Sequence, residues 1–267
     1  MIMGLSHIAM ATDDVEAATA RLAAFGYVPR FDRPGLENHA AKARYLTHHQ
    51  PTHHIRALAA EGAMAIELLD HGALAGPQTA ALLPVFRSPA PLPGWQLVAW
   101  QDLPIAPDSE HRLRAAIGPG LAAFHDPVLG LTLLWLPGSE QDATGLIACL
   151  LPCDDQAAMA DLLKHLRFRQ GGDTGLWSLL TPVASLQAHL MPVAARARSG
   201  WTSAPLLDAP GCACMAFMAR RTETTDLPVA LQGDSVSFTL TINENPSRIT
   251  MARPANGPII EMVDPLT

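Results

Sequence analysis

The first residues of the chain alternate between apolar and polar segments in a way that predicts a strand followed by a helix. Residues 4–11 form an apolar run too short for a three-turn helix, so we interpret them as a buried strand. Residues 12–14 then offer side-chain oxygens that can cap a helix, and Glu16 follows Asp13 at the spacing of a capping box. Apolar residues continue at helical spacing up to Gly26, a residue suited to end the helix.

Short apolar runs separated by turn signals continue to about residue 70 and predict a small sheet. We expect strands at 27–31, 43–47, 55–59 and 64–69, because each is a short run of strand-forming residues flanked by turn residues. Residues 32–39 contain a proline and a glycine, and we expect them to form a loop.

The second half of the chain opens like the first. A shift of 141 residues superposes identical residues at Gly4, Leu5, Asp13, Asp14, Ala17 and Leu22. An internal repeat of this kind indicates duplication. Less regular strand patterns follow each copy, with a linker expected at 137–142. We therefore expect an N-terminal pair of modules at 1–138 and a C-terminal pair at 144–267, the second module of each pair being degraded.

The opening stretch resembles a known superfamily. His-Ile-Ala-Met-Ala at 7–11, Asp-Asp-Val-Glu at 13–16 and Phe-Gly-Tyr at 25–27 resemble the first strand and helix of the vicinal-oxygen-chelate superfamily. This group includes glyoxalase I, methylmalonyl-CoA epimerase, extradiol dioxygenases and bleomycin-resistance proteins. The resemblance covers about the first seventy residues and implies an α+β fold. In that fold, tandem βαβββ modules form two curled mixed-sheet cups around a ligand or metal.

The resemblance also implies a metal site. In metal-binding members, a His of the first strand and an acid of the fourth strand are ligands, which here would be His7 and Glu67. Glu261 lies in a similar apolar strand near the C-terminus, where a carboxylate is costly to bury unless it is paired or bound to metal. One His and two carboxylates would suit Mn, Fe, Co, Ni or Zn. The ion would act as a Lewis acid on adjacent substrate oxygens, with Glu67 and Glu261 as the expected catalytic residues.

Each of these three side chains also has a purely structural explanation. His7 could be a hydrogen-bonded core histidine, and either glutamate could point into water from a half-buried strand. The other modules depart from the ligand pattern: Leu133-Leu134-Trp135 replaces the acid of the second module, and Ala148 stands where His7 stands in the first.

The pairing of the modules decides whether a complete site can form. In the third module, Gln187 or His189 falls near the position of Glu67, so no two sequence-adjacent modules supply a full ligand set. In fused monomeric glyoxalases of the superfamily, the first module pairs with the fourth. That pairing would bring His7, Glu67 and Glu261 into one cup and leave Gln187 and Trp95 in a metal-free one.

Two main functional hypotheses follow. The leading one is a glyoxalase-like, divalent-metal-assisted lyase, isomerase or dioxygenase acting on a small oxygenated molecule. The rival is a metal-free binding or sequestering protein of the bleomycin-resistance type. In that case an apolar cavity would be lined by Trp95, Trp100 and Trp135, with Gln187 as a further ligand contact. A catalytically silent scaffold is a third possibility.

Composition excludes other classes of function. The net charge of −7 and the lack of a Lys/Arg block argue against nucleic-acid binding. No apolar run reaches membrane-spanning length, and the Met-Ile-Met start lacks the basic residues of a secretion signal. We therefore expect no membrane partner, a cytoplasmic location, a small-molecule ligand, and a monomer or homodimer.

Two further groups of residues could bind metal. The four cysteines, Cys149, Cys153, Cys212 and Cys214, lack the spacing of a zinc knuckle and are expected to be buried free thiols. Cys212 and Cys214 should point to the same side of a strand. The histidine-rich tract 48–54 is expected to be a solvated turn, with a metal-binding tract as the alternative.

Overall fold

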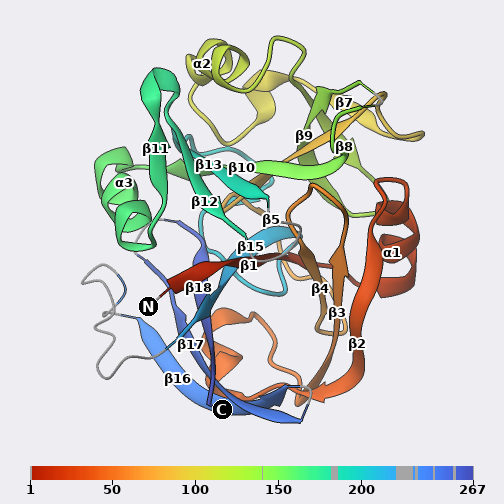
Figure 1. Ribbon diagram of the computed structural model, residues 1–267. Helices are drawn as coiled ribbons and strands as arrows, with labels where there is room; N and C mark the ends of the chain where they lie inside the picture. The colour runs from red at the N-terminus through yellow and green to blue at the C-terminus, as the bar shows by residue number, and fades with distance from the viewer. Residues whose placement is uncertain are drawn as a thin grey trace.

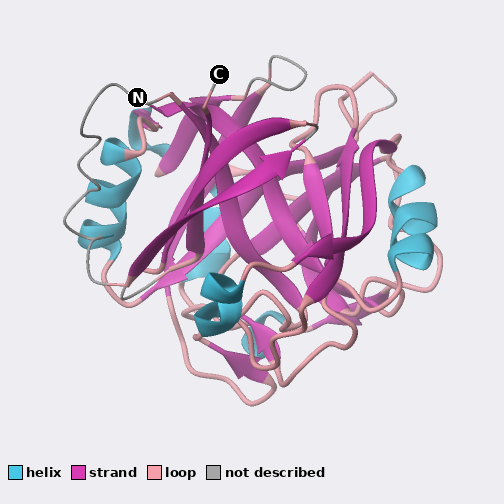
Figure 2. Cartoon of the chain, turned by 90° about the horizontal axis from the view of Figure 1, so that it is seen from below, coloured by secondary structure: helices cyan, strands magenta, loops and turns pink. Residues whose placement is uncertain are grey.

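The computed structural model describes residues 2–139, 141–181, 186–220, 231, 234–242, 244–254 and 257–266. Within these ranges, the strands form two eight-stranded mixed sheets and a separate two-stranded ribbon, with few helices (Figure 1). Figure 2 shows the strands gathered in the centre and the helices toward the outside. The predicted α+β fold of tandem modules in two curled sheets is confirmed. None of the described helices is long and apolar enough to cross a membrane.

The first sheet, in the lower half of Figure 1, combines strands from both ends of the chain. Its order is β16-β17-β18-β15-β1-β4-β3-β2. The strands of the first module are β1 (Ile2–Ala11), β2 (Val28–Glu37), β3 (Thr52–Ala59) and β4 (Ile66–Asp70). Those of the fourth are β15 (Gly211–Ala219), β16 (Ser235–Ile242), β17 (Asn245–Ala252) and β18 (Ile259–Pro265). The first and fourth modules therefore share one sheet.

The second sheet combines the two middle modules in the order β11-β12-β13-β10-β6-β9-β8-β7. Its strands are β6 (Leu83–Ser88), β7 (Gln96–Val98), β8 (Ala122–Asp126), β9 (Leu131–Pro137), β10 (Gly145–Cys153), β11 (Arg169–Gly171), β12 (Leu176–Leu180) and β13 (Gln187–Ala194). The ribbon pairs β5 (Gln78–Thr79) with β14 (Trp201–Thr202). Each sheet contains strands from both 1–138 and 144–267. The division of the chain into these two pairs of modules therefore stays a prediction from the sequence.

The two copies of the repeat begin their helices in the same way. Helix α1 (Val15–Ala23) follows Asp14, whose carboxylate accepts a hydrogen bond of 2.8 Å from the backbone N–H of Ala17. Helix α3 (Gln156–His165) follows Asp155 with an equivalent bond. The expected capping box of Asp13 and Glu16 is therefore wrong: Asp14 has the extended backbone of the N-cap, which puts Ala17 rather than Glu16 three residues after it.

The core has one large and two smaller parts. One face of each sheet packs against the other sheet and against α1 and α3 in a shared cluster that includes Ile8, Phe86 and Phe217. The opposite face of each sheet has a cluster of its own. A short helix covers each of these faces: η1 (Ala40–Tyr45) over the first sheet and α2 (Ser109–Ala116) over the second.

Two local predictions for the first module are wrong. Residues 32–37 continue strand β2 rather than form a loop, because β2 is an edge strand and its register shifts between Arg33 and Leu36. An edge strand with a bulge tolerates a proline that cannot donate a hydrogen bond. The strand expected at 43–47 is instead largely the helix η1, which His39 caps by accepting a hydrogen bond from the N–H of Ala41.

Candidate metal centre

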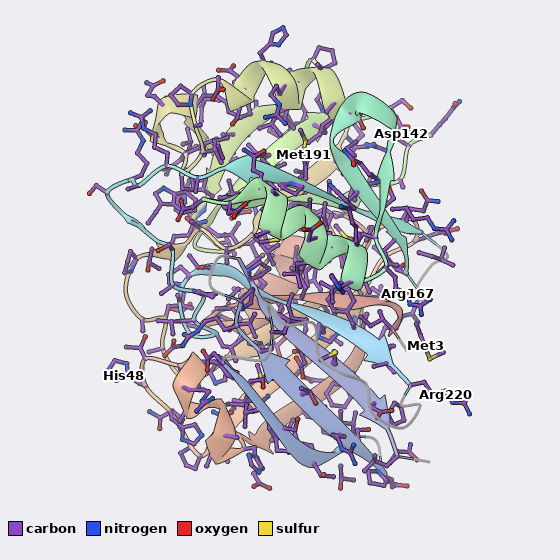
Figure 3. The ribbon with its side chains drawn as sticks, turned by 90° about the vertical axis from the view of Figure 1, so that its left-hand side faces the viewer. Met3, His48, Asp142, Arg167, Met191 and Arg220 are labelled. Atoms are coloured by element: carbon purple, nitrogen blue, oxygen red, sulfur yellow. The ribbon has the colours of Figure 1, made fainter. Side chains whose placement is uncertain are left out.

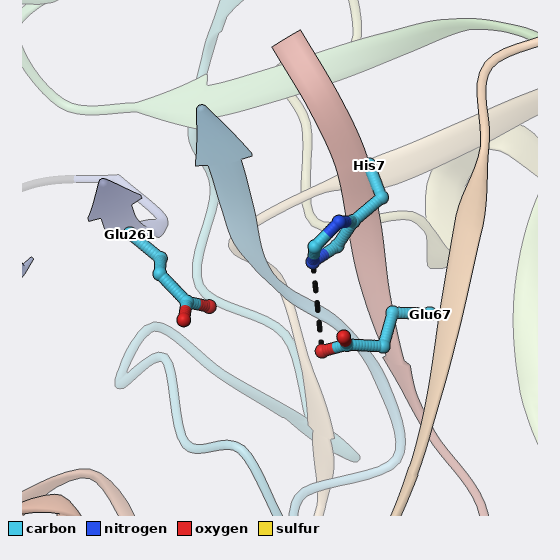
Figure 4. Close-up of side chains that lie close together, drawn as sticks. All are labelled: His7, Glu67 and Glu261. Atoms are coloured by element: carbon cyan, nitrogen blue, oxygen red, sulfur yellow. Dashed lines mark ion pairs between the residues drawn. The ribbon is translucent and has the colours of Figure 1, made fainter. Parts of the chain in front are cut away.

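The curled first sheet encloses a cavity of about 430 Å³ that is lined by residues from all eight of its strands. His7 of β1, Glu67 of β4 and Glu261 of β18 line this cavity and point toward one another (Figure 4). One potential ligand atom from each lies within 4.8 Å of the others. In the part of the chain that the structure describes, no other three His, Cys, Asp or Glu side chains converge in this way. The three predicted ligands are therefore brought together, and their role as ligands stays a prediction.

A bulge in β1 decides where His7 points. The register of β1 against β15 shifts between Leu5 and His7. Without the shift, the side chains of Leu5 and His7 would lie on the same face of the sheet, since side chains along a strand alternate between its two faces. Instead Leu5 enters the core between the sheets, and His7 enters the cavity. Bulges commonly redirect a side chain beside an active site.

The two glutamates occupy equivalent positions in the shared sheet. Glu67 pairs with Ala9 of the parallel strand β1, and Glu261 pairs with Ala216 of the parallel strand β15. Because β1 and β15 run antiparallel at the centre of the sheet, an approximate two-fold relates the glutamates. The two-fold brings both carboxylates to one cavity from opposite halves of the chain.

The same two-fold places a cysteine opposite His7. His7 lies two residues before Ala9, and Cys214 lies two residues before Ala216. Cys214 is a buried free thiol on the cavity side of the sheet. Burial and the nearby charges of Glu261 and Glu67 raise its pKa, and its sulfur is not one of the three ligand atoms that converge in the cavity. Cys212 enters the core between the sheets instead, which corrects the expectation that Cys212 and Cys214 share a side.

His7 is oriented by its neighbours but keeps one nitrogen free. Its Nδ1 lies 3.2 Å from Ser6 Oγ, so the tautomer protonated at Nδ1 donates there and leaves the lone pair on Nε2. Nε2 lies 3.5 Å from Glu67 Oε1 and has no hydrogen-bond partner among the described residues. Burial lowers the pKa of His7, but the charges of Glu67 and Glu261 outweigh it and raise the pKa above 6.5.

The environments of the two glutamates separate their pKa values. Burial alone would raise the pKa of Glu67, but the charges of His7 and Lys42 hold it below its usual value. For Glu261, burial and the charge of Glu67 outweigh the opposing charges of Lys42 and His7 and raise its pKa. Glu67 is therefore the more stable anion, and Glu261 is the more basic carboxylate.

Lys42 is a further cavity residue that the sequence did not single out. It lies on η1, is only 6% exposed and lines the same cavity as the three predicted ligands. The sequence placed this segment beside an expected strand, so nothing indicated that its lysine would be inside the cup.

The donor set fits a divalent ion. His7 Nε2 is buried without a hydrogen bond, and two carboxylates converge beside it. A divalent ion among the three would accept the imidazole lone pair and balance both carboxylates. One imidazole and two carboxylates are ligands that borderline divalent metals accept. Three protein ligands also leave coordination positions for water or substrate, as in catalytic sites.

The second sheet has apolar side chains at the positions that correspond to the three predicted ligands. Its register places Ala148 at the position of His7 and Met191 at that of Glu67. Leu83 and Leu134 take the places of Cys214 and Glu261. These four side chains belong to a packed apolar cluster, and Met191 is labelled in Figure 3. Met191, rather than Gln187 or His189, therefore matches Glu67.

The expected substrate-binding residues of the second sheet are dispersed. Trp95 and Trp135 pack against the core between the sheets, and their indole N–H groups donate to Asp126 and Ser88. Trp100 packs against the opposite face of the second sheet, and Gln187 is exposed. The structure does not bring these four residues into one cavity, and their role in binding stays a prediction.

The solvated-turn interpretation of the histidine tract is wrong for His53. His48 is exposed (Figure 3), but His53 is only 4% exposed and its ring lies 5.0 Å from that of His71. Both ring nitrogens of His53, Nε2 of His71 and Oδ1 of Asn38 are buried without a hydrogen-bond partner in the described residues. The alternation of His53, Ile55 and Ala57 along β3 was the signal that could have placed His53 inside.

Comparisons with known proteins agree on the fold. No family model matches the sequence, and no curated protein matches it. Glyoxalase I from Zea mays superposes with a TM-score of 0.55 at 10% identity, over 98% of this chain and 92% of that chain. A candidate dioxygenase from Bacillus subtilis subsp. subtilis str. 168 gives a TM-score of 0.53 at 14% identity, over 100% of this chain and 86% of that one. This chain therefore has the vicinal-oxygen-chelate fold.

Proposed function

We propose that this chain is a divalent-metal-assisted enzyme acting on a small oxygenated molecule, with His7, Glu67 and Glu261 holding the ion. One observation carries the proposal: three potential ligand atoms within 4.8 Å of one another, in a cavity formed by the whole of one curled sheet. The fold shared with glyoxalase I from Zea mays supports it.

The residues have separable tasks in this proposal. A bound divalent ion would supply Lewis-acid stabilisation of negative charge on substrate oxygens. Glu67, held as an anion, would neutralise charge and fix the geometry. Glu261, a carboxylate that lines the cavity beside the other two ligands, would accept a proton on a carboxylate oxygen and return it to a neighbouring substrate atom. The surrounding apolar side chains, such as Phe31, would exclude water.

The donor set favours proton transfer over oxygen chemistry. Non-haem iron oxygenases typically use two histidines and one carboxylate. This site has one histidine and two carboxylates, with a buried, protonated thiol at the fourth symmetric position. We therefore favour a lyase or isomerase over a dioxygenase. Oxygen uptake by the iron-loaded protein would contradict that preference.

The rival function, a metal-free sequestering protein, has weaker support. Its predicted binding surface was the set of three tryptophans, and these do not gather around one cavity in the described residues. The cavity that the first sheet does form has three ionisable groups at its centre. An uncharged binding site would leave those groups unexplained.

Thermal unfolding with and without metal tests the proposal. A ligand at about 100 times its Kd stabilises the fold by about 2.7 kcal/mol, or roughly 5–10 °C for a chain near this length. We expect such a shift with Mn, Ni or Zn in the wild type. His7→Ala and Glu261→Gln should lose most of it, whereas Glu37→Gln, at an exposed strand position, should keep it. If no metal shifts the wild type, or if all variants shift alike, the proposed site is wrong.

A further inference from the structure

We propose that the ligand of this cavity is a monoanion, a small carboxylic acid with an apolar body, and that Lys42 binds its carboxylate. This inference rests on the proposed function and names its substrate class. It starts from the one cation that the cavity contains besides any protonated His7, among the residues that line it.

The position of Lys42 is fixed by the helix that carries it. Helix η1 connects β2 to β3 along the chain and packs over the open face of the first sheet, against β16. His39 caps its start, and Tyr45 at its end donates a hydrogen bond of 3.1 Å to the carbonyl of Met251 on β17. Tyr45 is completely buried. A helix held at both ends keeps the lysine directed into the cup.

The side chain of Lys42 is largely buried, and its ammonium has no partner among the described residues. Among the described residues it forms no hydrogen bond and no ion pair, although Glu67 and Glu261 line the same cavity. Its charge still lowers the pKa of both glutamates, so it faces them across a gap. An ammonium on the wall of a largely apolar cavity gains from an anionic partner that replaces water. A carboxylate in that gap would satisfy the ammonium and lie beside the metal centre.

The charges of the complete site favour one negative charge on the ligand. Two ionised glutamates neutralise a divalent ion, and a metal-bound imidazole is neutral. The charge of Lys42 then remains. A monoanion brings the total to zero, whereas a neutral ligand leaves a net positive charge in a buried cavity.

The rest of the cavity accepts an apolar body. It is lined by aromatic and branched aliphatic side chains from both halves of the sheet: Phe31, Leu36, Ile55, Leu240, Ile242, Ile249 and Val263. Such walls with a few polar groups are typical of small-molecule sites. The polar end of the ligand would therefore face Lys42 and the metal, with its chain against these walls.

Calorimetric titration with matched probes tests this inference. Hexanoate and hexanamide have the same apolar chain, but only hexanoate is charged. Zn-loaded wild type should bind hexanoate at least tenfold more tightly than hexanamide. Lys42→Met should abolish that preference and should also bind Zn alone several-fold more tightly, because a repelling cation is gone. Lys164→Met, on an exposed lysine of α3, should change neither result.

The outcomes separate the two proposals. If wild type binds no Zn at the site, the proposed function fails and this inference fails with it. If Zn binds but hexanoate shows no preference over hexanamide, only the inference fails. A preference that survives in Lys42→Met would mean that the metal alone recognises the carboxylate, which also overturns the role of Lys42. The wild-type comparison needs no variant and stays decisive if Lys42→Met does not fold.

Discussion

Lowering the pH from about 8 to about 5 should destabilise the fold through two buried histidines. Burial, followed by the charges of Lys42 and His49, lowers the pKa of His53 to about 2 and that of His71 to about 4. Asp208 and Asp70 oppose the shift at His71 without cancelling it. Both rings therefore stay neutral in the folded chain at pH 5.

The size of the effect follows from proton linkage. In the unfolded chain the two imidazoles titrate near 6.5, so below that pH the unfolded state binds protons that the folded state refuses. Stability falls as the pH drops, and the loss from His71 stops near pH 4 while that from His53 continues toward pH 2. At pH 5 each histidine lowers the free energy of unfolding by about 2 kcal/mol relative to pH 8, or about 4 kcal/mol together. A typical fold has only about 5–15 kcal/mol of stability in total.

Urea unfolding of wild type and variants at both pH values isolates this effect from other titrating groups. His7 contributes in the opposite direction, because its raised pKa gives stability that is lost as the pH rises. Comparing the acid loss between wild type and His53→Leu removes such common contributions. The decrease in the free energy of unfolding between pH 8 and pH 5 should be about 2 kcal/mol smaller in His53→Leu than in the wild type. His71→Leu should reduce it by a similar amount.

His111→Leu is the matched control, since His111 lies exposed on α2. Its acid loss should equal that of the wild type. If His53→Leu and His71→Leu keep the full acid loss, the two rings do not stay neutral in the fold. The conclusion that His53 and His71 are buried and unprotonated in the folded chain would then be wrong.

Two further predictions concern single hydrogen bonds. Ser6→Ala removes the partner of His7 Nδ1 and should weaken Zn binding by about tenfold in calorimetry, as is common for groups that orient a ligand; unchanged affinity would show that Ser6 does not orient the ring. Tyr27→Phe leaves the carbonyl of Met64 and the N–H of Leu146 without the hydroxyl that joins them. It should cost about 1–3 kcal/mol in urea unfolding, and a smaller loss would mean that the bond between the two halves of the chain contributes little.

Much of the fold was predictable from local pattern and repetition. The apolar run at residues 4–11 and its repeat near 145 became β1 and β10, each followed by a helix with an aspartate cap. The superfamily resemblance identifies His7 and Glu67 as candidate ligands, and Glu261 stands out as a carboxylate in an otherwise apolar strand. Local sequence alone could not pair modules that lie far apart, which is a property of long-range packing. The likeness to fused glyoxalases supplied that arrangement.

The rest of the site depends on features that have no clear local signal. One extra residue in β1 decides the face on which His7 lies, and strand periodicity cannot locate such a bulge. Lys42 lies just before the strand that the sequence predicts at 43–47, and only the packing of η1 over the sheet puts it inside. The histidine-rich composition of 48–54 predicts a turn, whereas His53 is already part of strand β3.

A crystal structure of the protein with Zn, measured at the zinc absorption edge, tests the central claim most directly. We predict one strong anomalous peak bonded to His7 Nε2 and to carboxylate oxygens of Glu67 and Glu261, at about 2.0–2.2 Å from each. A crystal with anomalous peaks only elsewhere, for example between His53 and His71, would contradict the proposed metal centre. So would a structure in which Glu67 and His7 close into a direct hydrogen bond with no ion beside them.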